Sequence, residues 1–185
     1  MSFLRRASAA WARIEIVLAT SFAGAITALI LLNVVTRALD RSIYWVDEAA
    51  IYAMAWMTFL AASSSVHYGH SVAVSLLVDF TPERIGKIVA RCADFCVFLF
   101  AAAMVAFCWR WYRPDALIAA GFDVGAFQGS TFNFIYAEPT TLRINKAWIW
   151  SVMWLFSFGM ILHSAANLTL KFDSHRNTKS LDPVQ

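Results

Sequence analysis

Four long stretches of this chain carry no formal charge, and they decide what it can fold into. A helix rises about 1.5 Å per residue, so about 20 apolar residues cross the hydrocarbon core of a bilayer, which is about 30 Å thick. The stretches run from Ile16 to Thr36, Ala49 to Val66, Phe95 to Trp109 and Ala147 to Leu170. The sequence therefore predicts an all-α, polytopic membrane protein with one domain over residues 1–185 and transmembrane helices at about 14–36, 47–68, 86–111 and 147–170.

The composition agrees with a membrane protein and argues against other classes. Hydrophobic residues make up 60% of the 185 residues, against roughly 45 to 50% in soluble domains. The net charge is +3, but the cations lie at the ends of the expected helices, where membrane topology accounts for them. We therefore expect no nucleic-acid partner.

The distribution of Lys and Arg predicts the orientation, because cytoplasmic segments carry more of these residues than outer ones. With a cytoplasmic N-terminus, nine cations fall on inner segments and six on outer segments. The bias is modest and favours both termini in the cytoplasm. The inner cations are Arg5, Arg6, Arg13, Arg84, Lys87, Arg91, Lys171, Arg176 and Lys179, and the outer ones are Arg37, Arg41, Arg110, Arg113, Arg143 and Lys146.

A short amphipathic segment is expected at the inner membrane surface, before the third spanning helix. Thr81-Pro82 is typical of a helix start, with Thr as the N-cap and Pro at the first position. Three cations then recur on one helical face, at Arg84, Lys87 and Arg91. We interpret this cationic stripe as facing anionic membrane lipid, with a protein carboxylate as the alternative partner.

The connection between the third and fourth spanning helices, residues 110–146, is the longest in the chain. Its uncharged part, 124–137, carries two glycines and four aromatic residues, which suits an interfacial or re-entrant segment. Gly121, Gly125 and Gly129 predict that this part forms a poor helix. The sequence assigns no role to this loop.

Histidine could carry chemistry in a four-helix membrane protein, because facing imidazoles can hold haem. A pair could form from His163 and either His67 or His70, at the inner ends of the fourth and second helices. The same positions equally suit solvated histidines near helix C-termini. A four-helix haem-binding membrane redox protein is therefore kept as the alternative function.

Other kinds of site find little support. Ser63, Ser64 and Ser65 form a small polar patch that lets helices approach closely, with no carboxylate nearby to orient a catalytic base. The spanning helices lack the ionisable residues and paired Gly/Pro breaks of a transport pathway, and the first has only Asn33 near its outer end. We therefore expect a chain that is not an enzyme, with no metal site, no cofactor and no transport pathway of its own.

One ordered set of residues surrounds the first connection. Asn33 and Arg37 close the first helix, Trp45, Asp47 and Glu48 open the second, Trp56 follows eight residues later, and Tyr68-Gly69-His70 closes it. This pattern resembles the small membrane subunit of tripartite ATP-independent periplasmic (TRAP) transporters, the DctQ-like family. The resemblance covers about residues 30–90 by motif, and the whole chain by four-helix layout and size.

The resemblance implies a non-catalytic small permease subunit in the bacterial cytoplasmic (inner) membrane. It would scaffold a large, DctM-like membrane subunit that carries the substrate and sodium sites. A periplasmic substrate-binding protein would deliver an organic anion, such as a dicarboxylate, an oxo acid or a sialic acid. A sodium gradient would drive uptake, and the residues that select the substrate are expected on the other chains.

The same residues also have an interpretation that needs no partner. Asp47 and Glu48 complement the positive end of the second helix, and Arg37 can pair with either across the short connection. Two interpretations therefore stay open: a hairpin clasp within the chain, and contact with a partner subunit. The candidate residues for both are Asn33, Arg37, Trp45, Asp47, Glu48, Trp56 and His70.

Overall fold

The computed structural model describes residues 3–68, 82–138 and 141–169, without the side chains of 83, 84 and 87. Every regular element within these ranges is a helix. The helices are α1 (Phe3–Ala38), α2 (Tyr44–Tyr68), α4 (Glu83–Tyr112), α5 (Pro114–Ala119), α6 (Val124–Thr131), α7 (Lys146–Ile149) and α8 (Val152–Thr169).

Four helical segments are long and apolar enough to cross a membrane, which confirms the predicted fold class. They are α1, α2, the segment Ile88–Ala119 that includes most of α4, and the segment Lys146–Thr169 that includes α8. The largest difference from the expected bounds is in α1, which begins at Phe3 rather than near residue 14. At 36 residues α1 is about 54 Å long, so it extends well beyond a hydrocarbon core of about 30 Å.

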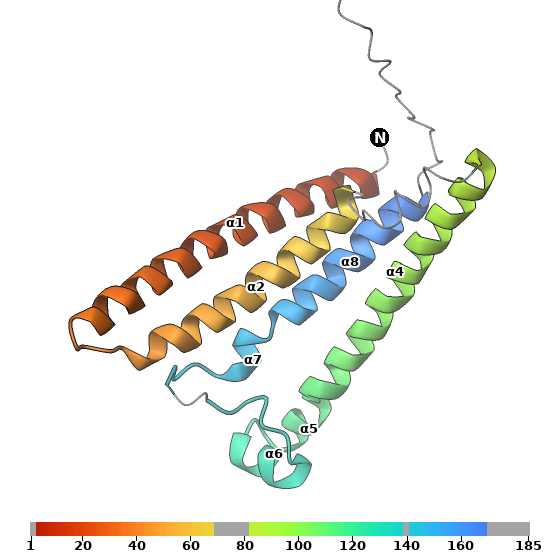
Figure 1. Ribbon diagram of the computed structural model, residues 1–185. Helices are drawn as coiled ribbons and strands as arrows, with labels where there is room; N and C mark the ends of the chain where they lie inside the picture. The colour runs from red at the N-terminus through yellow and green to blue at the C-terminus, as the bar shows by residue number, and fades with distance from the viewer. Residues whose placement is uncertain (1–2, 69–81, 139–140, 170–185) are drawn as a thin grey trace, which may run out of the picture.

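The spanning helices lie side by side in the order α1, α2, α8, α4 (Figure 1). The connection between α1 and α2 is short, as expected, so these two helices form an antiparallel hairpin. α8 packs against α1, α2 and α4. The N-terminal ends of α1 and α4 and the C-terminal ends of α2 and α8 lie together at one end of the molecule (Figure 1).

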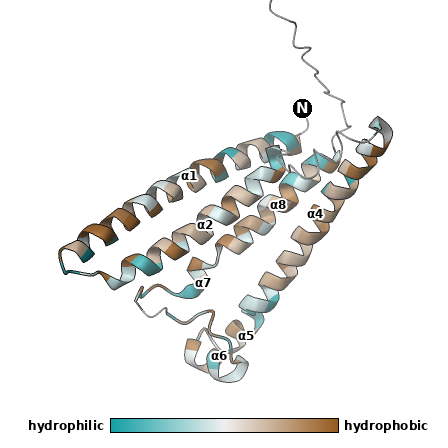
Figure 2. Ribbon diagram, in the orientation of Figure 1, coloured by the Kyte–Doolittle hydropathy of each residue, from teal (hydrophilic) through white to brown (hydrophobic). Residues whose placement is uncertain are grey.

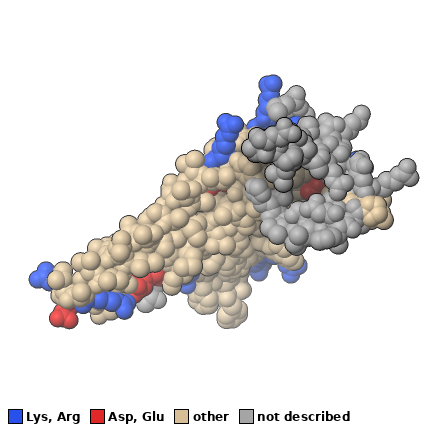
Figure 3. Space-filling view, turned by 45° about the horizontal axis from the view of Figure 1, so that its top comes forward, with Lys and Arg blue, Asp and Glu red and all other residues tan. Residues whose placement is uncertain are grey.

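Burial is concentrated on the central helix. Half of the apolar window around α8 is buried within the chain, against 11% for α1, 17% for α2 and 11% for the segment around α4. Hydrophilic residues gather at the helix ends (Figure 2), and Lys and Arg lie toward the two ends of a broad uncharged surface (Figure 3). The outward faces of α1, α2 and α4 therefore need lipid or another protein to cover them.

Small residues allow α8 to approach α1 and α2 closely. Ser63 on α2 and Ser157 and Ser164 on α8 are fully buried. A methyl group at Gly159 of α8 would collide with Glu15 Oε1 and Ser63 Oγ. Small interfacial side chains replace the hydrophobic effect as the basis of helix packing in a bilayer, because lipid is as apolar as the helices themselves.

A break between α7 and α8 is held by a tryptophan from the first hairpin. The α7 helix ends at Ile149 and α8 begins at Val152. The indole Nε1 of Trp56 donates to the Ile149 carbonyl at 2.7 Å, and its ring lies 5.5 Å from that of Phe22 on α1. Trp56 thus joins three helices at one point.

The long third connection contains two short helices, so the expectation that its glycines prevent a helix is wrong. Gly125 and Gly129 both lie within α6. Asp123 is the N-cap, and its carboxylate accepts from the backbone N–H groups of Gly125 at 2.8 Å and Ala126 at 3.2 Å. An N-cap of this kind is worth about 1 kcal/mol, which offsets about one helical glycine.

The connection also packs back onto the ends of the spanning helices. Phe127 of α6 is fully buried against Tyr112 and Ile135. The hydroxyl of Tyr136 donates to the Tyr112 carbonyl at 2.9 Å, and that of Tyr112 to the Ala147 carbonyl at 2.7 Å. Burial raises the pKa of Tyr136 above its ordinary value, so its hydroxyl keeps the proton that it donates.

The start of α4 is close to the expected one. Glu83 is its first residue and Pro82 is the N-cap itself, whereas Thr81 lies outside the described residues. Of the cationic stripe, Arg91 is exposed, and the side chains of Arg84 and Lys87 lie outside the description.

We expect Trp56→Phe to lower the thermal midpoint of the purified protein by about 1 to 6 °C. The ring contact with Phe22 survives, but the Ile149 carbonyl loses a hydrogen bond worth about 0.5 to 1.5 kcal/mol. Trp148→Phe is the matched control, because that side chain is 74% exposed. Equal midpoints for the two variants, measured by thermal unfolding in detergent, would contradict this role of Trp56.

Candidate functional site

A ring of three polar side chains closes the α1–α2 hairpin at the end where the two helices are connected. Arg37 donates through a terminal nitrogen to Asp47 Oδ2 at 2.7 Å and through Nε to Asn33 Oδ1 at 2.9 Å. Asn33 Nδ2 in turn donates to Asp47 Oδ1. Each carboxylate oxygen of Asp47 therefore has its own donor, and the two helices are joined by a closed set of contacts.

The position of this ring limits its strength. The side chains of Arg37 and Asp47 are 61% and 50% exposed. Exposed ion pairs contribute about 0.2 to 1 kcal/mol, so the ring defines the geometry of the hairpin more than its stability.

Glu48 does not pair with Arg37. It anchors the long third connection to α2 instead. Its Oε2 accepts from the backbone N–H groups of Thr141 at 3.1 Å and Leu142 at 3.0 Å and from the Thr141 hydroxyl, while Oε1 accepts from the Tyr52 hydroxyl at 3.0 Å. The adjacent carboxylates thus have separate roles, one in the hairpin and one in the loop.

The remaining candidates are dispersed. Trp45 is exposed on the first turn of α2, while Trp56 takes part in the packing of α1, α2 and α7. His70 lies outside the described residues.

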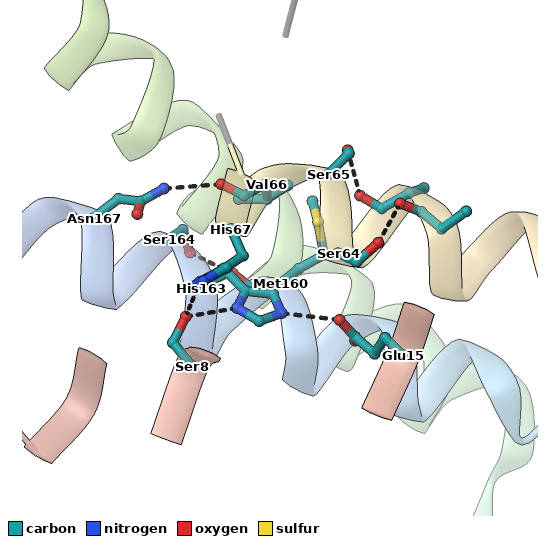
Figure 4. Close-up of polar contacts among 12 residues, drawn as sticks. Ser8, Glu15, Ser64, Ser65, Val66, His67, Met160, His163, Ser164 and Asn167 are labelled. Atoms are coloured by element: carbon teal, nitrogen blue, oxygen red, sulfur yellow. Dashed lines mark hydrogen bonds and ion pairs between the residues drawn. The ribbon is translucent and has the colours of Figure 1, made fainter. Parts of the chain in front are cut away.

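A second polar cluster lies inside the bundle, near the other end of the helices. It brings together His163 and His67, which the sequence indicated as a possible pair, with Glu15 and Ser8, which it did not indicate. Glu15 of α1 and His163 of α8 are 1% and 0% exposed, and His163 Nε2 lies 3.0 Å from Glu15 Oε2. The Ser8 hydroxyl lies 2.8 Å from Nδ1 of His163 and 2.7 Å from Nδ1 of His67 on α2. Figure 4 shows these side chains converging from three helices.

The cluster bears on two expectations. Ionisable residues were expected to be absent from the bilayer midplane of the spanning helices; Glu15 and His163 are ionisable, and they are buried between these helices. His163 was also considered as a solvated histidine, whereas it is completely buried. Glu15 was missed because it falls between Arg13 and the first charge-free stretch, where it reads as part of the polar N-terminal segment.

Both ring nitrogens of His163 are hydrogen-bonded in either charge state. If His163 is neutral, its Nε2–H donates to Glu15, Ser8 donates to its Nδ1, and His67 donates to Ser8. If His163 is an imidazolium, both its nitrogens donate and the Ser8 hydroxyl turns toward His67. Ser8 can serve both arrangements because a hydroxyl both donates and accepts.

This arrangement favours a structural role over haem binding or catalysis. Both nitrogens of His163 are engaged by protein groups, so neither is free to ligate iron. The rings of His67 and His163 lie 5.4 Å apart with Ser8 joining them. Ser8 is itself fully buried, which keeps a substrate carbonyl from its hydroxyl. Nor do the described residues contain a group of three metal-ligating side chains.

Close approach of the helices depends on Gly159. Three buried polar atoms surround it: Trp11 Nε1, Glu15 Oε1 and Ser63 Oγ. None of the three has a hydrogen-bond partner among the described residues. A larger residue at this position would displace the Glu15 carboxylate and the Ser63 hydroxyl or move α8 away from α1 and α2.

Comparison with known proteins agrees with the layout of the helices. A family model described as the DctQ component of tripartite ATP-independent periplasmic transporters matches residues 26–173. The chain is also similar to the C4-dicarboxylate TRAP transporter small permease protein DctQ of Vibrio cholerae serotype O1, with 31% identity over 102 residues. That match covers 55% of this chain and 44% of the relative, so it spans less than half of the relative's length. No solved structure matches the chain.

We expect Glu15→Leu and His163→Leu each to lower the thermal midpoint by about 6 to 20 °C. Either change leaves a buried polar or charged group without its partner, at a cost of about 3 to 5 kcal/mol. The thermal midpoint of the double variant should fall by less than the sum of the two single decreases, because the double variant removes both groups together.

The control is Met160→Leu, a buried change of similar volume one turn away on α8. Thermal unfolding of all four variants in one detergent measures the coupling. Strictly additive losses would show that Glu15 and His163 do not act as a pair.

Proposed function

The chain belongs to the DctQ family of TRAP transporter components, and we propose that it is the non-catalytic small permease subunit of such a transporter. The observation that carries this proposal is the family match over residues 26–173, which includes all of α2, α4 and α8. The four membrane-spanning segments support it independently. The haem-binding alternative is not favoured, because the protein itself engages the histidines it would need.

The role we propose within the complex is that of a scaffold for a large DctM-like subunit. Two polar clusters fix the helices at opposite ends, the exposed ring at Asp47 and the buried pair of Glu15 and His163. Between them α1, α2 and α4 present broad apolar faces that are little buried within the chain. A fixed, wide apolar surface suits a part against which a partner moves.

Transport itself belongs to the other components in this proposal. A periplasmic binding protein delivers an organic anion, and the large subunit carries it inward with a sodium gradient. The similarity to a C4-dicarboxylate permease protein makes a dicarboxylate the first substrate to test. Both termini would lie in the cytoplasm and the ring at Asp47 on the periplasmic side of the inner membrane.

Reconstitution tests the proposal directly. We expect the full chain, expressed with the large permease and binding protein encoded beside it, to co-purify with the large subunit. In proteoliposomes the complex should take up succinate in the presence of sodium, and uptake should fall to background without this chain. Recovery of the chain as a stable monomer, without a larger hydrophobic subunit, would contradict the proposal.

Arg37→Ala separates the hairpin clasp from a contact with the partner. If Arg37 acts as a clasp, it contributes about 0.2 to 1 kcal/mol to the free energy of unfolding. Its loss should then lower the thermal midpoint by no more than about 4 °C. The amount of complex recovered should fall in proportion to the lost stability. Arg41→Ala is the control, since Arg41 is exposed on the same connection. Loss of the large subunit from pull-downs at unchanged midpoint would show that Arg37 contacts the partner instead.

A further inference from the structure

A hollow of about 460 Å³ opens on the surface where α1 begins, beside the C-terminal ends of α2 and α8. Among the described residues, three arginines line it, Arg5, Arg6 and Arg13, and no carboxylate does. All three arginine side chains are exposed, and none forms an ion pair with another described residue. The hollow is therefore a concentrated positive site on a chain whose net charge is only +3.

The spacing of residues along α1 builds this hollow. Arg6 and Arg13 are seven residues apart, so they lie two turns apart on one face of the helix. Ala9 and Ala10 stand in the turn between them and also line the hollow. The alanine side chains are small, so they leave a space between the longer arginine side chains. Two or three guanidinium groups can reach one anion in this space.

The inner wall of the hollow is polar. Ser8 and His67 line it and are hydrogen-bonded to each other, and Asn167 of α8 contributes an amide that donates to the Val66 carbonyl. The wall is thus preorganised by the same contacts that join α1, α2 and α8. A bound anion meets an ordered surface rather than a set of freely moving side chains.

The depth of the hollow in the bilayer follows from the length of α1. The first charge-free stretch begins at Ile16, and α1 is some 24 Å longer than the hydrocarbon core. The turns that carry Arg5, Arg6 and Arg13 therefore lie at the level of the lipid headgroups. Directly beyond them α1 exposes Ile14 and Val17, at 50% and 64%.

We propose that this hollow binds the phosphate of an anionic phospholipid, with the acyl chains lying along the exposed apolar face of α1. Guanidinium groups match phosphate oxygens in bidentate geometry, and the adjoining apolar face fits the rest of a lipid. A free inorganic phosphate also offers oxygens to the guanidinium groups, but it has no apolar part to cover the exposed face of α1. The site is distinct from the stripe of Arg84, Lys87 and Arg91 on α4.

Native mass spectrometry of the full chain, with any subunit that co-purifies, tests this site. We expect one phosphatidylglycerol to be retained and phosphatidylcholine to be lost at the same concentration. Arg6→Gln/Arg13→Gln should weaken phosphatidylglycerol binding about 30-fold, at about fivefold for each arginine. The control is Arg41→Gln/Arg110→Gln, which removes the same charge from exposed positions at the other end of the helices and should leave binding unchanged.

A third variant distinguishes a built site from general attraction to a negative surface. Ala10→Leu keeps every charge but fills the hollow, so it should weaken binding severalfold. Equal binding by Ala10→Leu and the unaltered chain, or equal losses in the two arginine pairs, would overturn the proposal. Displacement of the lipid by millimolar inorganic phosphate would assign the hollow to the free anion and overturn the lipid assignment, whereas resistance to phosphate supports it.

Discussion

The packing of α1, α2 and α4 against the single central helix α8 is the constraint on which the rest of this structure depends. In a bilayer, apolar helices gain little from leaving lipid for one another, so close packing and polar contacts decide their arrangement. α8 supplies both: Gly159 and its buried serines admit the neighbouring backbones, and His163 meets Glu15 of α1. The position of α1 therefore depends on the buried contact of Glu15 with His163, which lies far from the short connection to α2.

The two ends of the α1–α2 hairpin are held in different ways, and the difference follows from burial. At the end beside the short connection, the side chains of Arg37 and Asp47 are 61% and 50% exposed, and their attraction is largely screened by solvent. At the opposite end, Glu15 and His163 are excluded from solvent, so breaking the pair leaves an uncompensated polar group. The buried cluster therefore sets the stability of the hairpin against α8, and the exposed ring sets its register.

The helices could be predicted from the sequence because charge-free length alone identifies them, and the short first connection required an antiparallel hairpin. The contacts between helices could not. Glu15 and His163 are 148 positions apart, and only their depth in the bundle makes them a pair. The long third connection was misjudged for a local reason, since the cap at Asp123 offsets about one of the two glycines, Gly125 and Gly129, in α6. Within the motif at the first connection, the sequence left open which carboxylate meets Arg37, because Asp47 and Glu48 are adjacent and differ only in the directions their side chains take.

A scaffold needs an interior held by fixed contacts and an outer surface that is free to contact a partner. The distribution of polar groups in this chain is compatible with both. The titratable groups of the inner cluster bond to one another, so they present no free charge to a transported anion. The exposed cations lie at the helix ends, where headgroups or solvent meet them, and the surface between is uncharged (Figure 3). The exposed hydroxyls on these faces, such as those of Thr20, Thr27 and Thr58, donate to carbonyls of their own helices. The proposed partner would therefore meet an uncharged surface whose hydroxyls are already engaged, and this fits the proposed role of a scaffold.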